Sequence, residues 1–312
     1  MPTAKILVVG SMNADFMTTV KELPEPGQTV IGTDLVTEPG GKSSNQAAAA
    51  ALLEADVTLI GVVGTDAIGD RLIIEASARG VDTSRVRRNP DTSTGCALIS
   101  VNREGENTII VSPGANATLR PEDVSDADLH GNPLVLMALE IPLETVVAVA
   151  ERAAAAGAQV LLNASPAQPL PRRLLANVDV LVVNEGELLE LLGDQIPSGQ
   201  WEDYARRLHE DGIERTVVTL GKQGAVVIEH SDGHLTITAV DPASVTAVDT
   251  TGSGDAFMGG LAAELAAGRT LTEAAQTGAL AGAWAAQGHG AQPSYGRRTD
   301  LDSLASTVAA RM

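Results

Sequence analysis

Residues 158–185 read AQVLLNASPAQPLPRRLLANVDVLVVNE, with a continuous apolar run at each end, 158–164 and 178–185. Apolar runs that do not alternate with polar residues are typical of parallel strands covered on both faces. Four more runs of this kind lie at 4–10, 57–64, 133–140 and 215–221. The sequence therefore predicts a mostly parallel sheet with these six runs as strands.

Helix signals separate the apolar runs. Pro142 is placed to begin a helix that Gly157 ends, and Gly80 follows a helix that begins near Asp66. Gly212 ends another helix before the last run, because glycine readily takes the backbone conformation found just after a helix. Strands that alternate with helices predict a doubly wound α/β fold, with helices on both faces of the sheet.

Two segments break this alternation, at about 14–38 and 93–113. The second holds two alternating runs joined by REGEN, which is the pattern of an antiparallel hairpin. We interpret both segments as a small β-lid inserted over the sheet. A further hairpin is predicted at 225–240, with its turn at 231–233. No repeat or Pro-rich linker divides the chain, so residues 1–312 are expected to form one domain with this lid.

Composition limits the classes of function. The 312 residues carry 40 acidic and 21 basic side chains, a net charge of −19, which argues against a nucleic-acid partner. No apolar run is long enough to span a membrane, and residues 4–10 predict a strand rather than a signal peptide. Cys96, the sole cysteine, cannot form an internal disulfide. We therefore expect a cytoplasmic protein with no membrane partner.

Polar side chains follow almost every predicted strand. They are Asn13, Asp15, Glu140, Asn163, Asn184, Glu187, Thr219 and Gly221, the last contributing its backbone. Each has an ordinary structural explanation; Asn184 with Glu187, for example, fits a helix N-cap and its capping-box partner. Ligands of open parallel sheets bind at the carboxyl ends of the strands. Their joint occurrence therefore predicts one binding crevice.

Two glycine-rich stretches resemble familiar phosphate loops without matching them. PGGKS at 39–43 would end a P-loop only if position 36 were glycine, and it is Val36. The glycines at 252 and 254 would begin a dinucleotide fingerprint only if position 257 were glycine, and it is Phe257. Neither the P-loop nor the Rossmann interpretation holds.

The stretch DTTGSGDAFMGGLAAEL, residues 249–265, leads small residues directly into a predicted amphipathic helix. Successive backbone N–H groups at such a helix N-terminus form a cradle for an anion, with the helix dipole behind it. Asp255 lies in the first turn, where a carboxylate is often only a favourable cap. Beside an anion cradle it also suits a base that deprotonates a hydroxyl. The arrangement predicts phosphoryl transfer.

At this point the sequence resembles the ribokinase-like carbohydrate kinase family, which includes fructokinases and adenosine kinases. The resemblance runs nearly end to end and rests on GSMNAD (10–15), GGKSSNQA (40–47), GENTIIVSPGANATL (105–119), VNEGE (183–187), DTTGSGDAF (249–257) and GAQPS (290–294). It implies ATP-dependent phosphorylation of the 5-hydroxyl of ribose, with Mg²⁺. Kinases for 2-deoxyribose, another small sugar or a nucleoside remain alternatives, and a non-catalytic sugar sensor is a more distant one.

The resemblance also implies a role for each matching residue. Asp255 would be the base, and Gly252, Ser253 and Gly254 the anion hole. The sugar would be held by Asn13, Asp15, Gly41, Lys42, Asn45 and Glu140. ATP and Mg²⁺ would be bound by Asn184, Glu187, Thr219, Gly221, Gly224 and Gly254. A monovalent cation, K⁺, would be bound by Asp249, Thr251, Ala285, Gly288, Gly290 and Ser294.

Two departures from the family pattern bear on the substrates. Ser43 and Ser44 stand where the family usually has Gly-Ala, which places two additional hydroxyls near the expected sugar. The helix expected at 271–287 is so rich in Ala and Gly that its adenine-contacting positions are not identified by matching. The apolar hairpin at 93–113 predicts a homodimer formed through the lid.

Overall fold

The computed structural model describes residues 5–131, 133–193, 200–231 and 233–309. Nine strands form the main sheet in the order β13-β12-β11-β10-β9-β8-β1-β4-β5. Their bounds are β1 (Lys5–Val9), β4 (Asp56–Gly64), β5 (Val86–Asn89), β8 (Leu134–Ala138), β9 (Gln159–Asn163), β10 (Val180–Asn184), β11 (Arg215–Thr219), β12 (Ala225–Ser231) and β13 (His234–Val240). All pairs from β5 to β11 are parallel, and β12 is antiparallel to both of its neighbours.

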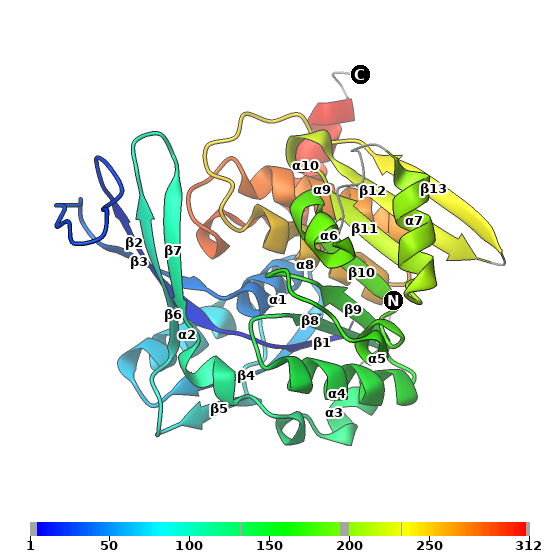
Figure 1. Cartoon of the computed structure of the whole chain (residues 1–312), viewed down its shortest axis with the longest axis horizontal. Helices are drawn as coiled ribbons and strands as arrows, with labels where there is room; N and C mark the ends of the chain where they lie inside the picture. Colours follow the sequence, from blue (N-terminus) through cyan, green and yellow to red (C-terminus); the bar gives the residue numbers. More distant parts are fainter. Residues whose placement is uncertain (1–4, 132, 194–199, 232, 310–312) are drawn as a thin grey trace.

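Helices cover both faces of this sheet (Figure 1). Along β1, Ile6 and Val8 enter one hydrophobic core, whereas Leu7 and Val9 enter the other. On the first face lie α1 (Lys42–Leu52), α2 (Ala67–Ala78), α8 (Ser253–Ala266), α9 (Leu271–Ala285) and α10 (Arg298–Ala309). On the second lie α3 (Asp126–His130), α4 (Leu143–Ala155), α5 (Arg172–Leu175), α6 (Glu185–Leu192) and α7 (Trp201–Glu210). The doubly wound α/β prediction is confirmed.

The local signals act as the sequence indicates. Asp66 caps α2 by accepting a hydrogen bond from the backbone N–H of Gly69 over 2.8 Å. Pro142 precedes α4, and Gly212 follows α7 with φ of 89°. All six predicted strands and the late hairpin form. The predicted first residue of β1, Ala4, and the turn residue Asp232 lie outside the described residues.

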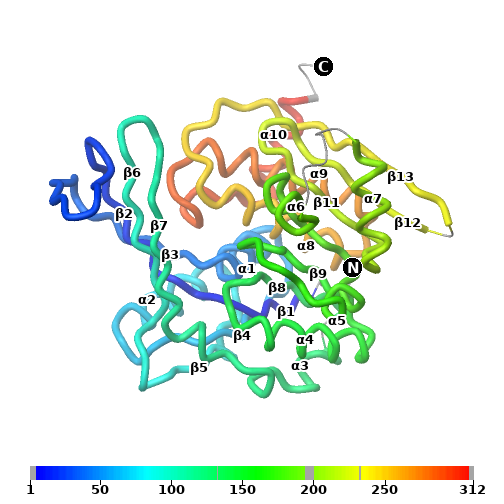
Figure 2. Tube along the Cα trace, viewed as in Figure 1, coloured from blue at the N-terminus to red at the C-terminus, as the bar shows by residue number. Residues whose placement is uncertain are grey.

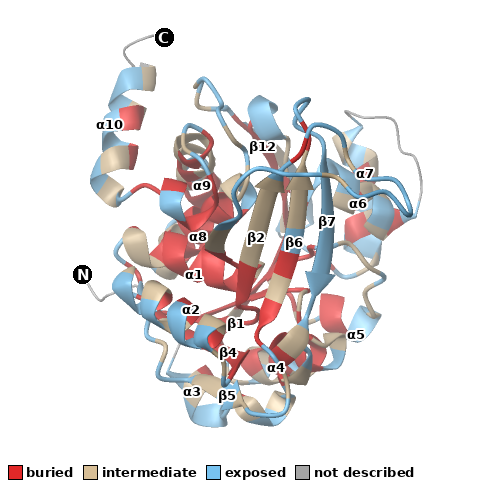
Figure 3. Ribbon diagram, turned by 90° about the vertical axis from the view of Figure 1, so that its left-hand side faces the viewer, coloured by how far each residue is buried: buried red, intermediate tan, exposed pale blue. Residues whose placement is uncertain are grey.

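A second sheet of four strands stands at one side of the main sheet (Figures 1 and 2). Its order is β3-β2-β6-β7, with β2 (Asn13–Thr19), β3 (Val36–Gly40), β6 (Gly95–Val101) and β7 (Asn107–Ser112). The parallel pairing of β2 with β6 joins the two segments predicted to form the lid, and β7 completes the predicted hairpin. Figure 3 shows β7 exposed along its whole length. The predicted small sheet is therefore present.

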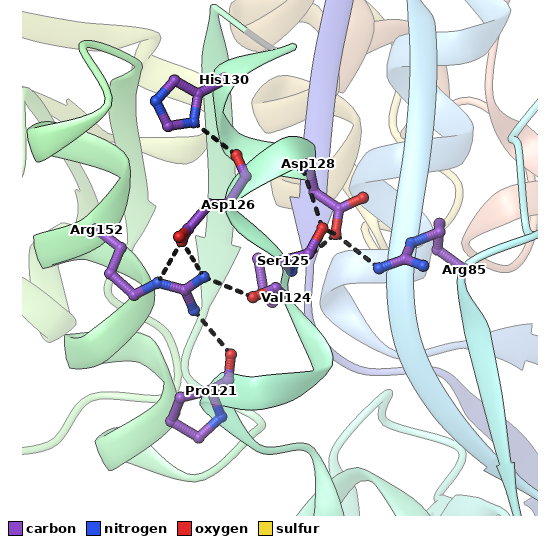
Figure 4. A network of polar contacts seen from close by, with 8 residues as sticks. All are labelled: Arg85, Pro121, Val124, Ser125, Asp126, Asp128, His130 and Arg152. Carbon is purple, nitrogen blue, oxygen red and sulfur yellow. Dashed lines mark hydrogen bonds and ion pairs between the residues drawn. The ribbon is translucent and has the colours of Figure 1, made fainter.

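Short 3₁₀ helices and polar contacts complete the connections. The 3₁₀ helices are Gly114–Thr118, Pro121–Asp123, Gly221–Gln223 and Gln292–Ser294. Figure 4 shows Arg152 of α4 donating to the carbonyls of Pro121, at 2.9 Å, and Val124, at 2.8 Å, and pairing with Asp126. The guanidinium thus ties α3 and the segment before it to α4. Within the described residues, no helix combines the length and apolar character needed to cross a membrane.

Candidate active site

The N-terminus of α8 lies among the carboxyl ends of the parallel strands. Its N-cap is Gly252, whose left-handed φ of 72° favours glycine. A Cβ atom at Gly252 would stand 2.6 Å from Cβ of Ala291 and 2.7 Å from the hydroxyl of Tyr295, so a side chain does not fit. A Cβ built on Gly254 would meet no atom of the described residues within 4 Å. The first turn of α8 is therefore open to an anion at Gly254, whereas the backbone N–H of Ser253 donates to the carbonyl of Thr250 at 3.1 Å.

Asp255, in that first turn, is buried with 8% of its surface exposed. Nδ2 of Asn45 donates to Oδ2 of Asp255 over 2.9 Å, and Nε2 of Gln46 donates to Oδ1 over 3.0 Å. Nε2 of Gln46 also lies 3.0 Å from Oδ1 of Asn163 at the end of β9. Two amides from α1 thus fix the orientation of the carboxylate.

Small residues let α1 and α8 approach closely enough for these hydrogen bonds. Gly259 lies one turn after Asp255, and Ala49 lies one turn after Asn45. A Cβ on Gly259 would stand 2.4 Å from Cβ of Ala49 and 2.7 Å from the backbone nitrogen of Ala50. The alanine-rich face of α1 and the glycine of α8 therefore place the amides beside the carboxylate.

Charges in the site favour a proton-accepting centre next to a fixed cation. Burial raises the pKa of Asp255 above its ordinary value, although Lys42 and the two amide donors act against that rise. Burial opposes protonation of Lys42, but three carboxylates around it, Asp255 foremost, raise its pKa. Lys42 therefore stays positively charged beside a carboxylate that binds protons more readily than an exposed one.

The residues predicted to hold a sugar gather beside Asp255. Oε2 of Glu140, after β8, accepts from Oγ of Ser11 at 2.6 Å and from the backbone N–H of Lys42 at 2.9 Å. Gly41 is the N-cap of α1 with φ of 85°. A Cβ at Gly41 would stand 2.7 Å from the backbone nitrogen of Asn13, so the chain needs glycine there.

Asn13 and Asp15 lie on β2 of the lid sheet. Oδ1 of Asn13 accepts from Nδ2 of Asn116 over 2.7 Å, which fixes the orientation of its amide. Burial and the nearby carboxylates of Glu140 and Asp255 raise the pKa of Asp15 to about 7. These two side chains thus bring polar groups of the lid to the same site as the N-terminus of α8.

Two neighbouring hollows meet at this site. The larger, of about 500 Å³, is lined by Gly221, Gly224 and Ser253 among others, and the smaller, of about 150 Å³, by Lys42 and Asp255 among others. Both are bordered by Asn184, Thr219 and Gly254. A long ligand in the larger hollow would therefore present one end to Asp255 past the first turn of α8.

Asn184 and Glu187 form a capping box at the start of α6. Oδ1 of Asn184 accepts from the backbone N–H of Glu187 at 2.8 Å, and Oε2 of Glu187 accepts from the backbone N–H of Asn184 at 2.9 Å. The structural interpretation of this pair is confirmed. Both residues also border the smaller hollow, so the cap leaves them beside the expected phosphates.

The six residues predicted to bind a monovalent cation lie in two adjoining segments, 249–251 before α8 and 285–294 from the last residue of α9 to a 3₁₀ helix. Oδ1 of Asp249 accepts from the backbone N–H of Thr251, and Oδ2 accepts from that of Gly290, both at 2.9 Å. A Cβ at Gly288 would stand 2.8 Å from Cβ of Ser294, so these two residues touch. Ala285 ends α9 at the start of the second segment. The structure thus brings the predicted set together.

Sequence reasoning missed several polar residues of the site. Gln46 lies in GGKSSNQA and Gln292 in GAQPS, but neither motif by itself predicts a role for its glutamine. Nε2 of Gln292 donates to Oδ1 of Asn45 at 3.0 Å and lies 3.2 Å from Oγ of Ser44. Ser44 therefore faces Gln292, and a Cβ at Gly10 would stand 1.9 Å from Oγ of Ser43. The hydroxyls of Ser43 and Ser44 therefore contact neighbouring atoms of the protein itself.

Matching to the family did not identify adenine-contacting positions within 271–287. The lining of the larger hollow gives candidates for them. From α9 the hollow is lined by Ala279, Gly282 and Ala283, followed by Ala286 just after the helix. This stretch of the helix therefore contributes no bulky side chain to the hollow. The signal was present in the sequence as the Ala- and Gly-rich composition of 271–287.

Comparison with known proteins agrees with this geometry. Residues 3–297 match the pfkB family carbohydrate kinases. The chain is 36% identical over 298 residues to ribokinase of Staphylococcus aureus (strain COL), covering 94% of this chain and 96% of that protein. It is 35% identical over 296 residues to deoxyribokinase of Salmonella typhi, covering 93% and 95%.

Among solved structures, Arabidopsis thaliana ribokinase complexed with ribose and ATP superposes with a TM-score of 0.88 at 32% identity, covering 97% of this chain and 98% of that one. The fold and the site define an enzyme that transfers a phosphoryl group to an alcohol. The chain belongs to the pfkB family of carbohydrate kinases.

Proposed function

We propose that the protein phosphorylates the 5-hydroxyl of D-ribose with ATP, giving D-ribose 5-phosphate and ADP. The observation that carries this proposal is the buried carboxylate of Asp255, held by Asn45 and Gln46 beside the open first turn of α8. Similarity to ribokinases over nearly the whole chain supports ribose as the sugar.

In this proposal Asp255 accepts the proton of the sugar 5-hydroxyl. The N–H groups of Gly252 and Gly254, and that of Ser253 once it leaves the carbonyl of Thr250, then hold the transferring phosphoryl group. Lys42 adds a positive charge at the same hollow. The sugar hydroxyls are held by Asn13, Asp15, Gly41, Asn45 and Glu140. Because the lid strand β2 supplies Asn13 and Asp15, sugar binding requires both sheets.

The nucleotide fits the larger hollow. A volume of about 500 Å³ lies within the range of pockets that hold small-molecule ligands and cofactors. Thr219, Gly221 and Gly224 would lie along ATP, and Asn184 with Glu187 would organise Mg²⁺ and the phosphates. Mg²⁺ would supply the neutralising charge on the phosphate oxygens. The many acidic side chains make such local neutralisation necessary.

Three further features belong to the proposal. K⁺ would be held by Asp249, Thr251, Ala285, Gly288, Gly290 and Ser294. Two chains would pair through their lids, because β7 exposes apolar side chains on both faces. The enzyme would work in the cytoplasm, where its single cysteine stays reduced.

A kinase for 2-deoxyribose is the second candidate. The observation that favours it is the 35% identity to a deoxyribokinase, which is almost the same as the 36% identity to a ribokinase. Overall similarity therefore does not separate the two sugars.

A coupled ADP-release assay across pentoses, hexoses and nucleosides tests the function. We expect the highest kcat/KM with ribose, and Asp255→Asn should lower turnover by about 10² to 10⁴ while leaving ribose binding nearly unchanged. Full turnover by Asp255→Asn would remove this carboxylate from the role of base. A higher kcat/KM with another sugar would replace ribose.

A further inference from the structure

Two histidines and a glutamate from α7, the connection to β11, and β12 lie close together. These elements stand on the side of the molecule opposite the lid sheet (Figure 1). His209 lies in the last turn of α7, Glu214 in the connection to β11, and His230 near the end of β12. One potential ligand atom from each residue lies within 4.8 Å of the other two. Nδ1 of His209 is 3.2 Å from Oε1 of Glu214, and the two imidazole rings stack with centroids 4.5 Å apart.

The cluster is partly open to solvent and contains an unsatisfied nitrogen. The side chains of His209 and Glu214 are 52% and 54% exposed, so an ion can reach them. Nδ1 of His230, by contrast, is buried and has no hydrogen-bond partner among the described residues. A buried ring nitrogen without a partner costs free energy unless another group or an ion binds nearby. The three residues border a hollow of about 660 Å³.

We propose that His209, Glu214 and His230 form a binding site for a divalent transition metal ion of the zinc class. Imidazole nitrogens and a carboxylate oxygen are ligands that Zn²⁺ prefers, and three protein ligands leave a fourth position for water. The His209–Glu214 separation of 3.2 Å already suits two ligands of a tetrahedral ion. The stacked imidazole ring of His230 has to rotate and move closer before its nitrogen can complete the set.

Charges around the cluster are compatible with a cation. Glu202 and Arg206 of α7 face the same hollow, and the guanidinium of Arg206 is paired with Asp203. Zn²⁺ binds an imidazole only through a nitrogen that carries no proton. Affinity should therefore fall in acid, as the imidazoles become protonated.

The site is remote from the phosphoryl-transfer chemistry. Thr219, at the active-site end of β11, lies five residues after Glu214, which is about 16 Å along a strand. His230 donates its backbone N–H to the carbonyl of Glu214 at the far end of the same strands. A bound ion would join α7, the β11 connection and β12, so its role is to stabilise this edge of the sheet.

Metal titration of the untagged protein, in excess Mg²⁺ and without nucleotide, tests the site. Mg²⁺ occupies sites that offer oxygen ligands alone, whereas Zn²⁺ or Co²⁺ selects imidazole. We expect one Zn²⁺ per chain, a d–d absorption band of four-coordinate Co²⁺, and a higher Tm with Zn²⁺. His230→Ala and, separately, His209→Gln should each lower Zn²⁺ affinity at least about tenfold.

Matched controls separate this site from other zinc ligands. His130→Ala, on the surface of α3, and Cys96→Ser, on β6, should keep the wild-type affinity and stoichiometry. Ribose kinase activity should be unchanged in His209→Gln, with circular dichroism confirming the fold. Absence of zinc-dependent stabilisation in the wild type would overturn the proposal, as would unchanged Zn²⁺ affinity in both cluster variants.

Discussion

Nε2 of Gln46 lies 3.0 Å from Oδ1 of Asp255, and the two residues are 209 positions apart in the sequence. The same nitrogen lies 3.0 Å from Oδ1 of Asn163, so this amide bridges α8 and β9. A buried carboxylate that accepts from Gln46 and Asn45 cannot rotate freely. The two amides also act electrostatically: burial raises the pKa of Asp255, and both donors oppose that rise because they stabilise its ionised form.

Gln46→Met removes the donor while keeping the length of the side chain. We expect a lower kcat and a kinetic pKa on the acid side of the pH–rate profile that is higher than in the wild type. The cause is that Asp255 keeps its burial but loses one hydrogen bond to its charged form. The measurement is kcat/KM as a function of pH with ribose and ATP saturating in turn. An unshifted profile would show that Gln46 serves packing alone.

Asp15 gives a prediction about stability in the absence of sugar. Its pKa rises from 3.8 in an unfolded chain to about 7 in the fold, chiefly through burial. The folded state thus binds more protons than the unfolded state between about pH 4 and pH 7, so this group makes stability fall as pH rises through that window. The effect is no more than about 4 kcal/mol.

Asp15→Asn should therefore raise the Tm of the sugar-free enzyme at pH 8 and change it little at pH 4. Thermal unfolding at both pH values checks this, with Asp56→Asn, at an exposed position at the start of β4, as the matched control. Equal effects of Asp15→Asn at both pH values would contradict the assigned pKa.

The main sheet and its helix caps could be predicted because local sequence determines them. Strands such as β8 and β10 are buried on both faces and read as unbroken apolar runs. The capping box of Asn184 and Glu187 depends on two residue types within four consecutive positions. Periodicity and short-range spacing are therefore enough for these elements.

The contacts that complete the site could not be predicted from the residues in this way. Gln46 reads as one more residue of an alanine-rich helix, and its role depends on the approach of α1 to α8 at Gly259. Gln292 reaches Asn45 across 247 positions. Such hydrogen bonds follow from tertiary packing, which no local pattern encodes. Glu38 is similar, since its carboxylate, on the lid strand β3, lies against Gly290, 252 positions later in the chain.

K⁺ should activate the enzyme more than Na⁺. The carboxylate of Asp249 is oriented by the backbone N–H groups of Thr251 and Gly290, which also lower its pKa despite the opposing effect of burial. An anionic anchor beside loops rich in carbonyl groups suits a large monovalent ion. Initial rates in buffers freed of K⁺, with KCl or NaCl added at equal ionic strength, measure the effect. Equal rates in the two salts would contradict it.

The lid should mediate a two-fold dimer. Leu98 and Ile110 lie opposite each other on β6 and β7, with 50% and 62% of their surfaces exposed. An exposed edge strand with apolar side chains is covered in most proteins. Ile110→Glu should shift light scattering at micromolar concentration from dimer to monomer. Ile74→Glu, at an exposed apolar position on α2, should leave the dimer intact. A monomeric wild type would refute the pairing.

We predict that ribose is preferred over 2-deoxyribose and that the pocket distinguishes the two sugars through Asn13. Its amide is oriented by Asn116 at 2.7 Å and lies two residues before Asp15 on β2. A sugar without the 2-hydroxyl leaves one of these buried polar groups without a partner, which costs about 1.5 to 3 kcal/mol, or roughly 10- to 150-fold in kcat/KM. Asn13→Met keeps the length of the side chain but removes the amide, so it should reduce this preference by lowering activity with ribose more than with 2-deoxyribose. The ratio of kcat/KM for the two sugars, measured in both proteins, decides the matter. A wild-type ratio near one would favour the deoxyribokinase alternative or a pocket that ignores this hydroxyl, and an unchanged ratio in Asn13→Met would assign the discrimination to another residue.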